Sequence, residues 1–161
     1  MDYSRQKILI RRWLIFFIIA LALSGSTAFA LETELHFLLG LWPDQSGGAV
    51  HDWIQKTYDA LKDANVRYPF LAYGYDWLAF AHFVIAIAFI GPFLDPVRNK
   101  WVIQFGMISC ILVFPLAFIA GGVRGIPVYW RLIDCSFRVL GLIPLSICLK
   151  KIGLLENLRP G

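Results

Sequence analysis

The sequence has little charge and lacks the cysteine motifs that carry redox chemistry. Only 16% of its 161 residues are charged, whereas about a quarter is usual for a soluble domain. Its three cysteines all lie in apolar segments, and neither C-x-x-C nor C-x-x-C-H occurs. Dithiol exchange and c-type haem attachment therefore have no motif to support them. The shortage of charge indicates a chain that resides in lipid.

Long basic tracts, internal repeats and low-complexity segments are also missing. The net charge of +4 therefore does not predict a nucleic-acid partner, because such binding needs basic residues clustered on one surface. A haem held between helices needs paired intramembrane histidines, and only His82 lies in an apolar stretch. We expect neither a metal nor a cofactor.

What the sequence has in abundance is apolar length. A transmembrane helix needs about 20 mostly apolar residues, and the stretches that qualify are 11–30, 74–94, 101–120 and 128–149. The last two connections are short, which makes sequential helices antiparallel neighbours. We therefore predict one all-α integral membrane domain over residues 1–161, an antiparallel four-transmembrane-helix bundle.

Basic residues predict which side of the membrane each segment occupies. They gather before the first span, between the second and third, and after the fourth: Arg5, Lys7, Arg11, Arg12, Arg98, Lys100, Lys150, Lys151 and Arg159. Segments rich in Lys and Arg tend to stay in the cytoplasm. We therefore expect cytoplasmic N- and C-termini, an external loop over 31–73, and residence in a bacterial inner (plasma) membrane.

The first span has an alternative interpretation as a cleaved signal peptide. A basic start, an apolar run and the A-x-A pair Ala28 and Ala30 fit that pattern. The apolar run of about 20 residues is long for a signal, whose apolar region usually has roughly 7–15. We therefore expect an uncleaved helix.

The external loop has helical periodicity of its own. Over 49–65 the apolar residues follow helical spacing and charged residues occupy the other side, which predicts an amphipathic helix. Residues 31–42 form a second helix or extend the first span. Such helices lie on a membrane surface or cap a bundle, and a packing lid without chemistry is their commoner role.

The fourth span carries three charges on one stripe. Arg131, Asp134 and Arg138 recur at steps of three and four, which places them on one helical face. At about 1.5 Å per residue, Arg138 lies roughly 15 Å deep in a hydrocarbon core about 30 Å thick. A charge there costs about 2.5–3.5 kcal/mol on insertion scales. We expect the stripe to face the bundle interior, with Asp134 bonded to at least one arginine.

Other polar residues fall in the same outer half of the membrane. Asp76 lies near the outer end of the second span, His82 lies about 12 Å down, and Arg124 lies in the turn GGVRGIP. We therefore predict a ligand pocket formed by Arg131, Asp134, Arg138, His82, Asp76 and Arg124. His82 and Asp134 are its candidates for catalytic proton exchange.

A structural interpretation competes with this pocket. Buried charges can serve helix pairing alone. A lone histidine on an apolar helix is more often a satisfied hydrogen-bond partner than a ligand, and a charge in a turn such as Arg124 is usually solvated. For the whole set of Arg131, Asp134, Arg138 and His82 we favour the pocket, because ionisable residues inside a membrane are functional hypotheses by default.

The layout resembles, in architecture, the emopamil-binding group of sterol-handling proteins. Both have four spans, a helical first loop and ionisable groups toward the interior, although no motif matches closely enough to transfer residues. Two hypotheses follow for the function. The protein binds or transforms a membrane lipid or another isoprenoid-like amphipathic molecule, or it is a non-catalytic accessory subunit that docks a membrane protein through 31–73.

Overall fold

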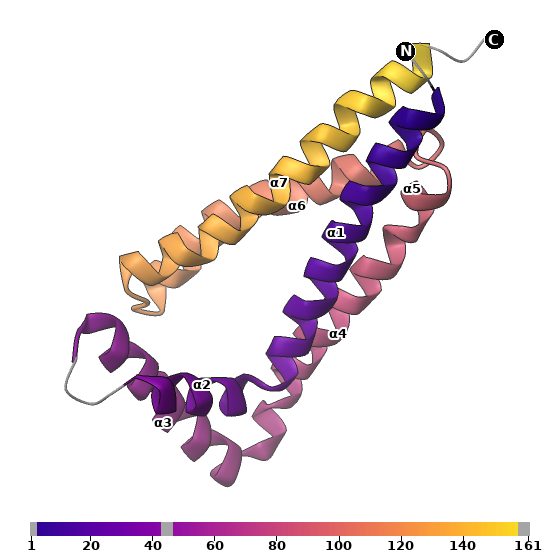
Figure 1. The fold of residues 1–161 in the computed structure, drawn as a ribbon. Helices are drawn as coiled ribbons and strands as arrows, with labels where there is room; N and C mark the ends of the chain where they lie inside the picture. The colour runs from indigo at the N-terminus through magenta and orange to yellow at the C-terminus, as the bar shows by residue number, and fades with distance from the viewer. Residues whose placement is uncertain (1–2, 43–46, 158–161) are drawn as a thin grey trace. The chain divides into compact units, whose positions relative to one another are not determined.

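The computed structural model describes residues 3–42 and 47–157, and this part of the chain is helical without strands. Its elements in chain order are shown in Figure 1: α1 Tyr3–Phe29, α2 Leu31–Leu41, α3 Ala49–Arg67, the 3-10 helix η2 Pro69–Leu71, α4 Tyr73–Ala88, α5 Ile90–Leu94, α6 Lys100–Val123 and α7 Val128–Asn157.

Four helical segments are long and apolar enough to cross a membrane: Tyr3–Phe29, Pro69–Leu94, Lys100–Val123 and Val128–Asn157. The prediction of an all-helical chain with four apolar spans is confirmed at this level. The helices run past the predicted boundaries, and α7 continues through Lys150 to Asn157. Hydropathy marks where lipid should end, whereas backbone hydrogen bonding continues the helix into the polar region.

The second span contains a break between α4 and α5 at Phe89. Pro92 follows three residues later and has no N–H to donate to the carbonyl of Ala88, so the regular hydrogen-bond ladder stops there. Instead the Phe89 N–H donates to the Ala86 carbonyl at 3.2 Å, a tighter turn than that of an α-helix.

The chain divides into two compact units. The first unit contains the chain up to Ile19 and from Ala86 onward, and the second unit contains Ala20–Ile85. The predicted single domain stays a prediction.

The core of the first unit is apolar and closely packed. Its fully buried side chains come from α1, α5 with the residue before it, α6 and α7: Ile10, Leu14, Phe89, Pro92, Ile103, Pro144, Leu145, Cys148 and Ile152, together with Leu155. Gly106 of α6 faces the ring of Phe89, where an added Cβ would lie 2.6 Å from Cζ. The absent side chain therefore makes room for the aromatic ring, as small residues do between membrane helices.

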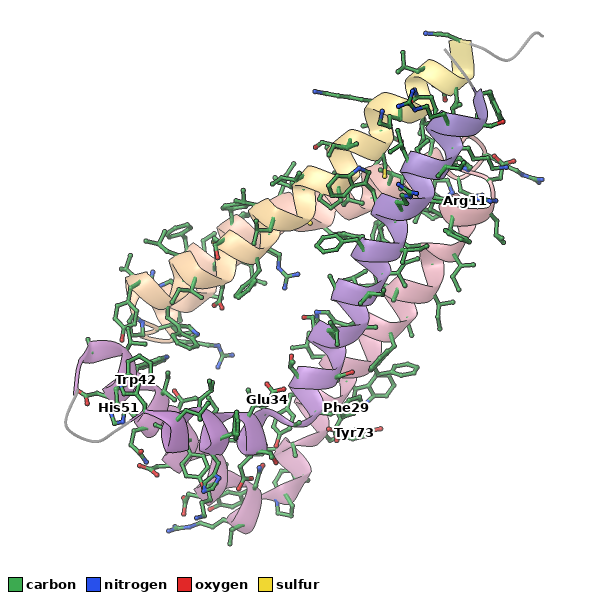
Figure 2. The ribbon with its side chains drawn as sticks, in the orientation of Figure 1. Arg11, Phe29, Glu34, Trp42, His51 and Tyr73 are labelled. Carbon is green, nitrogen blue, oxygen red and sulfur yellow. The ribbon has the colours of Figure 1, made fainter. Side chains whose placement is uncertain are left out.

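Polar contacts join the helix ends of this unit. The Arg11 Nε–H donates to the Phe93 carbonyl at 3.1 Å, and its guanidinium lies 5.2 Å from the ring centroid of the same residue (Figure 2). Two further contacts join Lys100 Nζ to Glu156 Oε2 at 2.7 Å and Lys151 Nζ to Gln6 Oε1 at 3.0 Å. The starts of α1 and α6 therefore lie beside the ends of α5 and α7.

The second unit packs the end of α1 against α4. At Gly25 an added Cβ would lie 3.0 Å from both the Ala79 carbonyl oxygen and the His82 Cβ. The rings of Phe29 and Phe83 stack with their centroids 6.2 Å apart. The glycine thus allows a close approach of the two helices.

A hydrogen-bond chain joins α2, α3 and α4 in the second unit. Tyr75 Oη donates to Asn65 Oδ1, and Asn65 Nδ2 donates to Glu32 Oε2, each at 2.6 Å. The rings of Trp42 and His51, at the facing ends of α2 and α3, lie 6.1 Å apart (Figure 2). These contacts connect the two helices to each other and to the start of α4.

Candidate functional site

Two arginines of α7 lie on the same face of the helix as its buried residues. From Leu145 onward its buried residues recur at steps of three and four, at Leu145, Cys148, Ile152 and Leu155, and Cys135 and Pro144 are also buried. Arg131 and Arg138 continue this face on either side of Cys135 and are half-buried, whereas Asp134 is exposed. The helix α6 lies alongside α7 in the same unit (Figure 1).

Arg131 is held by the turn between α6 and α7. Its Nε–H donates to the Ile126 carbonyl at 2.7 Å. Its aliphatic chain covers Gly121, where an added Cβ would lie 2.7 Å from the arginine Cδ. This side chain therefore has a structural role, and one edge of its guanidinium is already engaged.

The turn itself closes α6 by a Schellman motif. The Ile126 N–H donates to the Gly121 carbonyl at 2.9 Å, and the Gly125 N–H donates to the Gly122 carbonyl at 3.1 Å. Gly125 has φ of 67°, a conformation that glycine adopts at little cost. The glycine-rich sequence thus forms the turn.

Arg138 has an unsatisfied donor. Its Nε is buried and has no hydrogen-bond partner among the residues that the structure describes. Leaving a buried donor without an acceptor costs about 1–3 kcal/mol, and more for a charged group. The guanidinium interacts electrostatically with the Asp134 carboxylate. Of the predicted site residues, Arg138 has the strongest need for a further partner.

The predicted bond from Asp134 to an arginine is not formed. Within the part of the chain that the structure describes, the Asp134 carboxylate makes neither a hydrogen bond nor an ion pair. Arg131 turns to the Ile126 carbonyl, and Arg138 is half-buried while Asp134 is exposed. Only the Coulombic attraction between Asp134 and Arg138 remains of the predicted pairing.

The other predicted residues are distributed over both units. Arg124 is exposed at the C-cap of α6 in the first unit. Asp76, in the first turn of α4, and His82 belong to the second unit. His82 Nδ1 donates to the Leu78 carbonyl of its own helix at 2.7 Å. The structure thus brings Arg124, Arg131, Asp134 and Arg138 together on one hairpin, and the pocket of all six residues stays a prediction.

The sequence did not indicate two features of the second unit. One is the Tyr75–Asn65–Glu32 chain, whose members lie 10 and 33 residues apart, a separation at which no local periodicity operates. The other is an open hollow of about 370 Å³ on α2, lined by Thr33, Glu34, Phe37 and Leu38. Its lining comes from a single helix, so it offers a ligand one wall and no enclosure.

Comparisons with the models of known protein families, with curated proteins and with solved structures find no match for this chain. The chemistry of the candidate site therefore rests on its own residues.

Proposed function

We propose that this protein binds a lipid- or isoprenoid-like amphipathic molecule, with Arg138 and Arg131 holding its polar head in the outer half of the bilayer. The observation that carries the proposal is the buried, unsatisfied Nε of Arg138, on a helix long and apolar enough to cross a membrane. Hydrocarbon offers no acceptors, so such a group is satisfied by protein, by water or by a ligand. A polar head with acceptor oxygens meets this need.

We also propose how the chain is arranged in the membrane. The four spans form an antiparallel bundle in a bacterial inner (plasma) membrane, with both termini in the cytoplasm and with α2 and α3 outside. Two observations support it. Basic residues concentrate at the segments assigned to the inside. The helix ends of those segments are joined by the contacts of Arg11, Lys100 and Lys151.

Cysteine labelling tests the orientation. In intact cells, a membrane-impermeant maleimide should label Lys56→Cys, on the exposed side of α3, and should label Arg98→Cys only after permeabilisation. Both positions are exposed, and the native cysteines are buried, so background labelling should be low. Asn99 is unsuitable because its amide donates to the carbonyls of Gly91 and Asp95. Labelling of Arg98→Cys alone in intact cells would reverse the proposed orientation.

Retained lipid tests the binding function. Native mass spectrometry of the purified parent should show a lipid-sized adduct that survives removal of detergent. Arg138→Met should weaken its binding by about 10- to 100-fold, because a hydrogen bond to a charged group contributes about 1.5–3 kcal/mol. Arg98→Met, which removes an exposed arginine in a turn, should retain the adduct. A purified parent protein without any bound lipid would contradict the proposal.

The remaining predicted residues enter the proposal as contributors. His82, Asp76 and Arg124 are candidates for further contacts to the head, and His82 and Asp134 are the candidates for proton exchange if the guest is transformed. His82→Ala in the same binding measurement separates a ligand contact from the hydrogen bond within α4.

A second candidate function is that of an accessory subunit that docks a larger membrane complex through residues 31–73, which include α2. The supporting observation is the exposure of its apolar side chains, with Phe37 exposed by 64% and Leu41 by 65%. Exposed apolar side chains that cluster on one element are typical of an interaction surface. A parent without bound lipid that copurifies with a stoichiometric membrane protein would favour this function.

A further inference from the structure

From the charges of α7, we infer that the head bound at Arg138 is a singly charged oxyacid, a carboxylate or a phosphodiester, and this inference rests on the proposed function. The charges of the stripe formed by Arg131, Asp134 and Arg138 do not cancel. The stripe holds two guanidinium groups, on Arg131 and Arg138, and one carboxylate, on Asp134. It therefore carries one positive charge in excess.

No other residue of the first unit's apolar segments offsets this excess. Residues 13–19 of α1 and 101–123 of α6 contain no acidic or basic residue. Asp76, the other carboxylate of the predicted spans, belongs to the second unit. A single anionic group brings the net charge of the stripe to zero. A neutral or zwitterionic head leaves one positive charge uncompensated in a medium of low dielectric constant.

The guanidinium groups of Arg131 and Arg138 differ in which of their donors are engaged. A guanidinium presents its donors in a planar fork, which matches two oxygens of one carboxylate or phosphate. The Nε edge of Arg131 is occupied by the Ile126 carbonyl, whereas the Nε of Arg138 has no hydrogen-bond partner. Because the Nε of Arg138 is enclosed by protein, Arg138 offers the anion the edge formed by its two terminal nitrogens, and Arg131 contributes its charge from the turn.

Asp134 sets the charge of the head that fits. Its exposed carboxylate interacts electrostatically with Arg138, so it offsets one guanidinium without covering it. A head with two negative charges would be repelled by this carboxylate. Removing the Asp134 charge should therefore change the preference from singly to doubly charged heads.

Head-group ranking on the detergent-solubilised full chain tests the inference. The probes are phosphatidylglycerol, phosphatidylethanolamine, diacylglycerol and phosphatidic acid with identical acyl chains, with oleate as the single-carboxylate probe, and native mass spectrometry gives their relative affinities. For the parent we expect phosphatidylglycerol or oleate to bind at least about tenfold more tightly than phosphatidylethanolamine and diacylglycerol. The stronger of the two singly charged probes identifies the source, phospholipid or free acid.

Three variants of the stripe and one control show which residues determine the order of head-group affinities. Arg138→Gln should abolish the preference, and Arg138→Lys, which keeps the charge without the fork, should retain only part of it. Asp134→Asn should turn the preference toward phosphatidic acid. Arg98→Gln, at an exposed turn, should leave the ranking of the parent unchanged.

The outcomes separate this inference from the proposed function. Equal affinity of the parent for all head groups would overturn the inference while leaving lipid binding in place. A preference that Arg98→Gln removes as effectively as Arg138→Gln would also overturn it, because the anion would then be attracted by surface charge. Absence of binding for every probe would overturn the proposed function itself. The relative affinities of the parent for the five probes test the inference even if a variant fails to fold.

Discussion

Replacing Asp134 with leucine is expected to destabilise the protein more than replacing Asp134 and Arg138 together. The single substitution leaves the two guanidinium groups of an apolar helix without a counter-charge. Because Asp134 is exposed and forms no ion pair within the described residues, the cost should lie below the roughly 3–5 kcal/mol of breaking a buried pair. The double variant Asp134→Leu/Arg138→Leu removes the unsatisfied Nε of Arg138 as well. Its free energy of unfolding should therefore lie closer to that of the parent.

Unfolding in mixed micelles at increasing fractions of a denaturing detergent measures this difference. Arg131 is left in place in both variants because its side chain covers Gly121. The matched control is Asp63→Leu, since Asp63 and Arg67 have the same spacing of four residues and form an exposed ion pair at 2.8 Å. Such a surface pair contributes about 0–1 kcal/mol. A single Asp134 variant as stable as the control would show that the α7 charges are hydrated.

Replacing Gly106 with alanine is the second substitution with a large expected effect. An added Cβ would lie 2.6 Å from Cζ of Phe89 and 3.1 Å from Cδ1 of Leu145, and both of these side chains are fully buried. Overpacking of this kind costs about 1–3 kcal/mol, which outweighs the helix propensity of about 1 kcal/mol that alanine gains over glycine. We expect a lower Tm in detergent for Gly106→Ala.

Gly153→Ala is the control for this substitution, because Gly153 lies in α7 and an added Cβ there meets no atom within 4 Å. It should leave the Tm unchanged or raise it slightly. The double variant Gly106→Ala/Phe89→Leu should recover part of the loss, since the shorter side chain withdraws from the new methyl group. If Gly106→Ala were as stable as Gly153→Ala, the close contact between α6 and Phe89 would be refuted.

The sequence by itself determined that the chain is helical and has four apolar segments of membrane-crossing length. Both properties are local, because each depends on the composition of about 20 neighbouring residues. The sequence also singled out Arg131, Asp134 and Arg138, because charges within an apolar segment stand out without any knowledge of the fold. The sequence predicted the ends of the helices less well, since α7 continues beyond the apolar stretch to Asn157.

The partners of those residues were decided only by the tertiary structure. The spacing of Asp134 and Arg138 allows an ion pair, but the hairpin turns Arg131 to the Ile126 carbonyl and leaves the Nε of Arg138 without an acceptor. That choice depends on Gly121, ten residues before Arg131 on the opposite helix, whose missing side chain makes room for the arginine. The contacts of Gly106 with Phe89 and of Asn65 with Glu32 likewise join different helices. Periodicity tells which residues share a face of one helix, whereas the residues that oppose that face depend on how the helices pack.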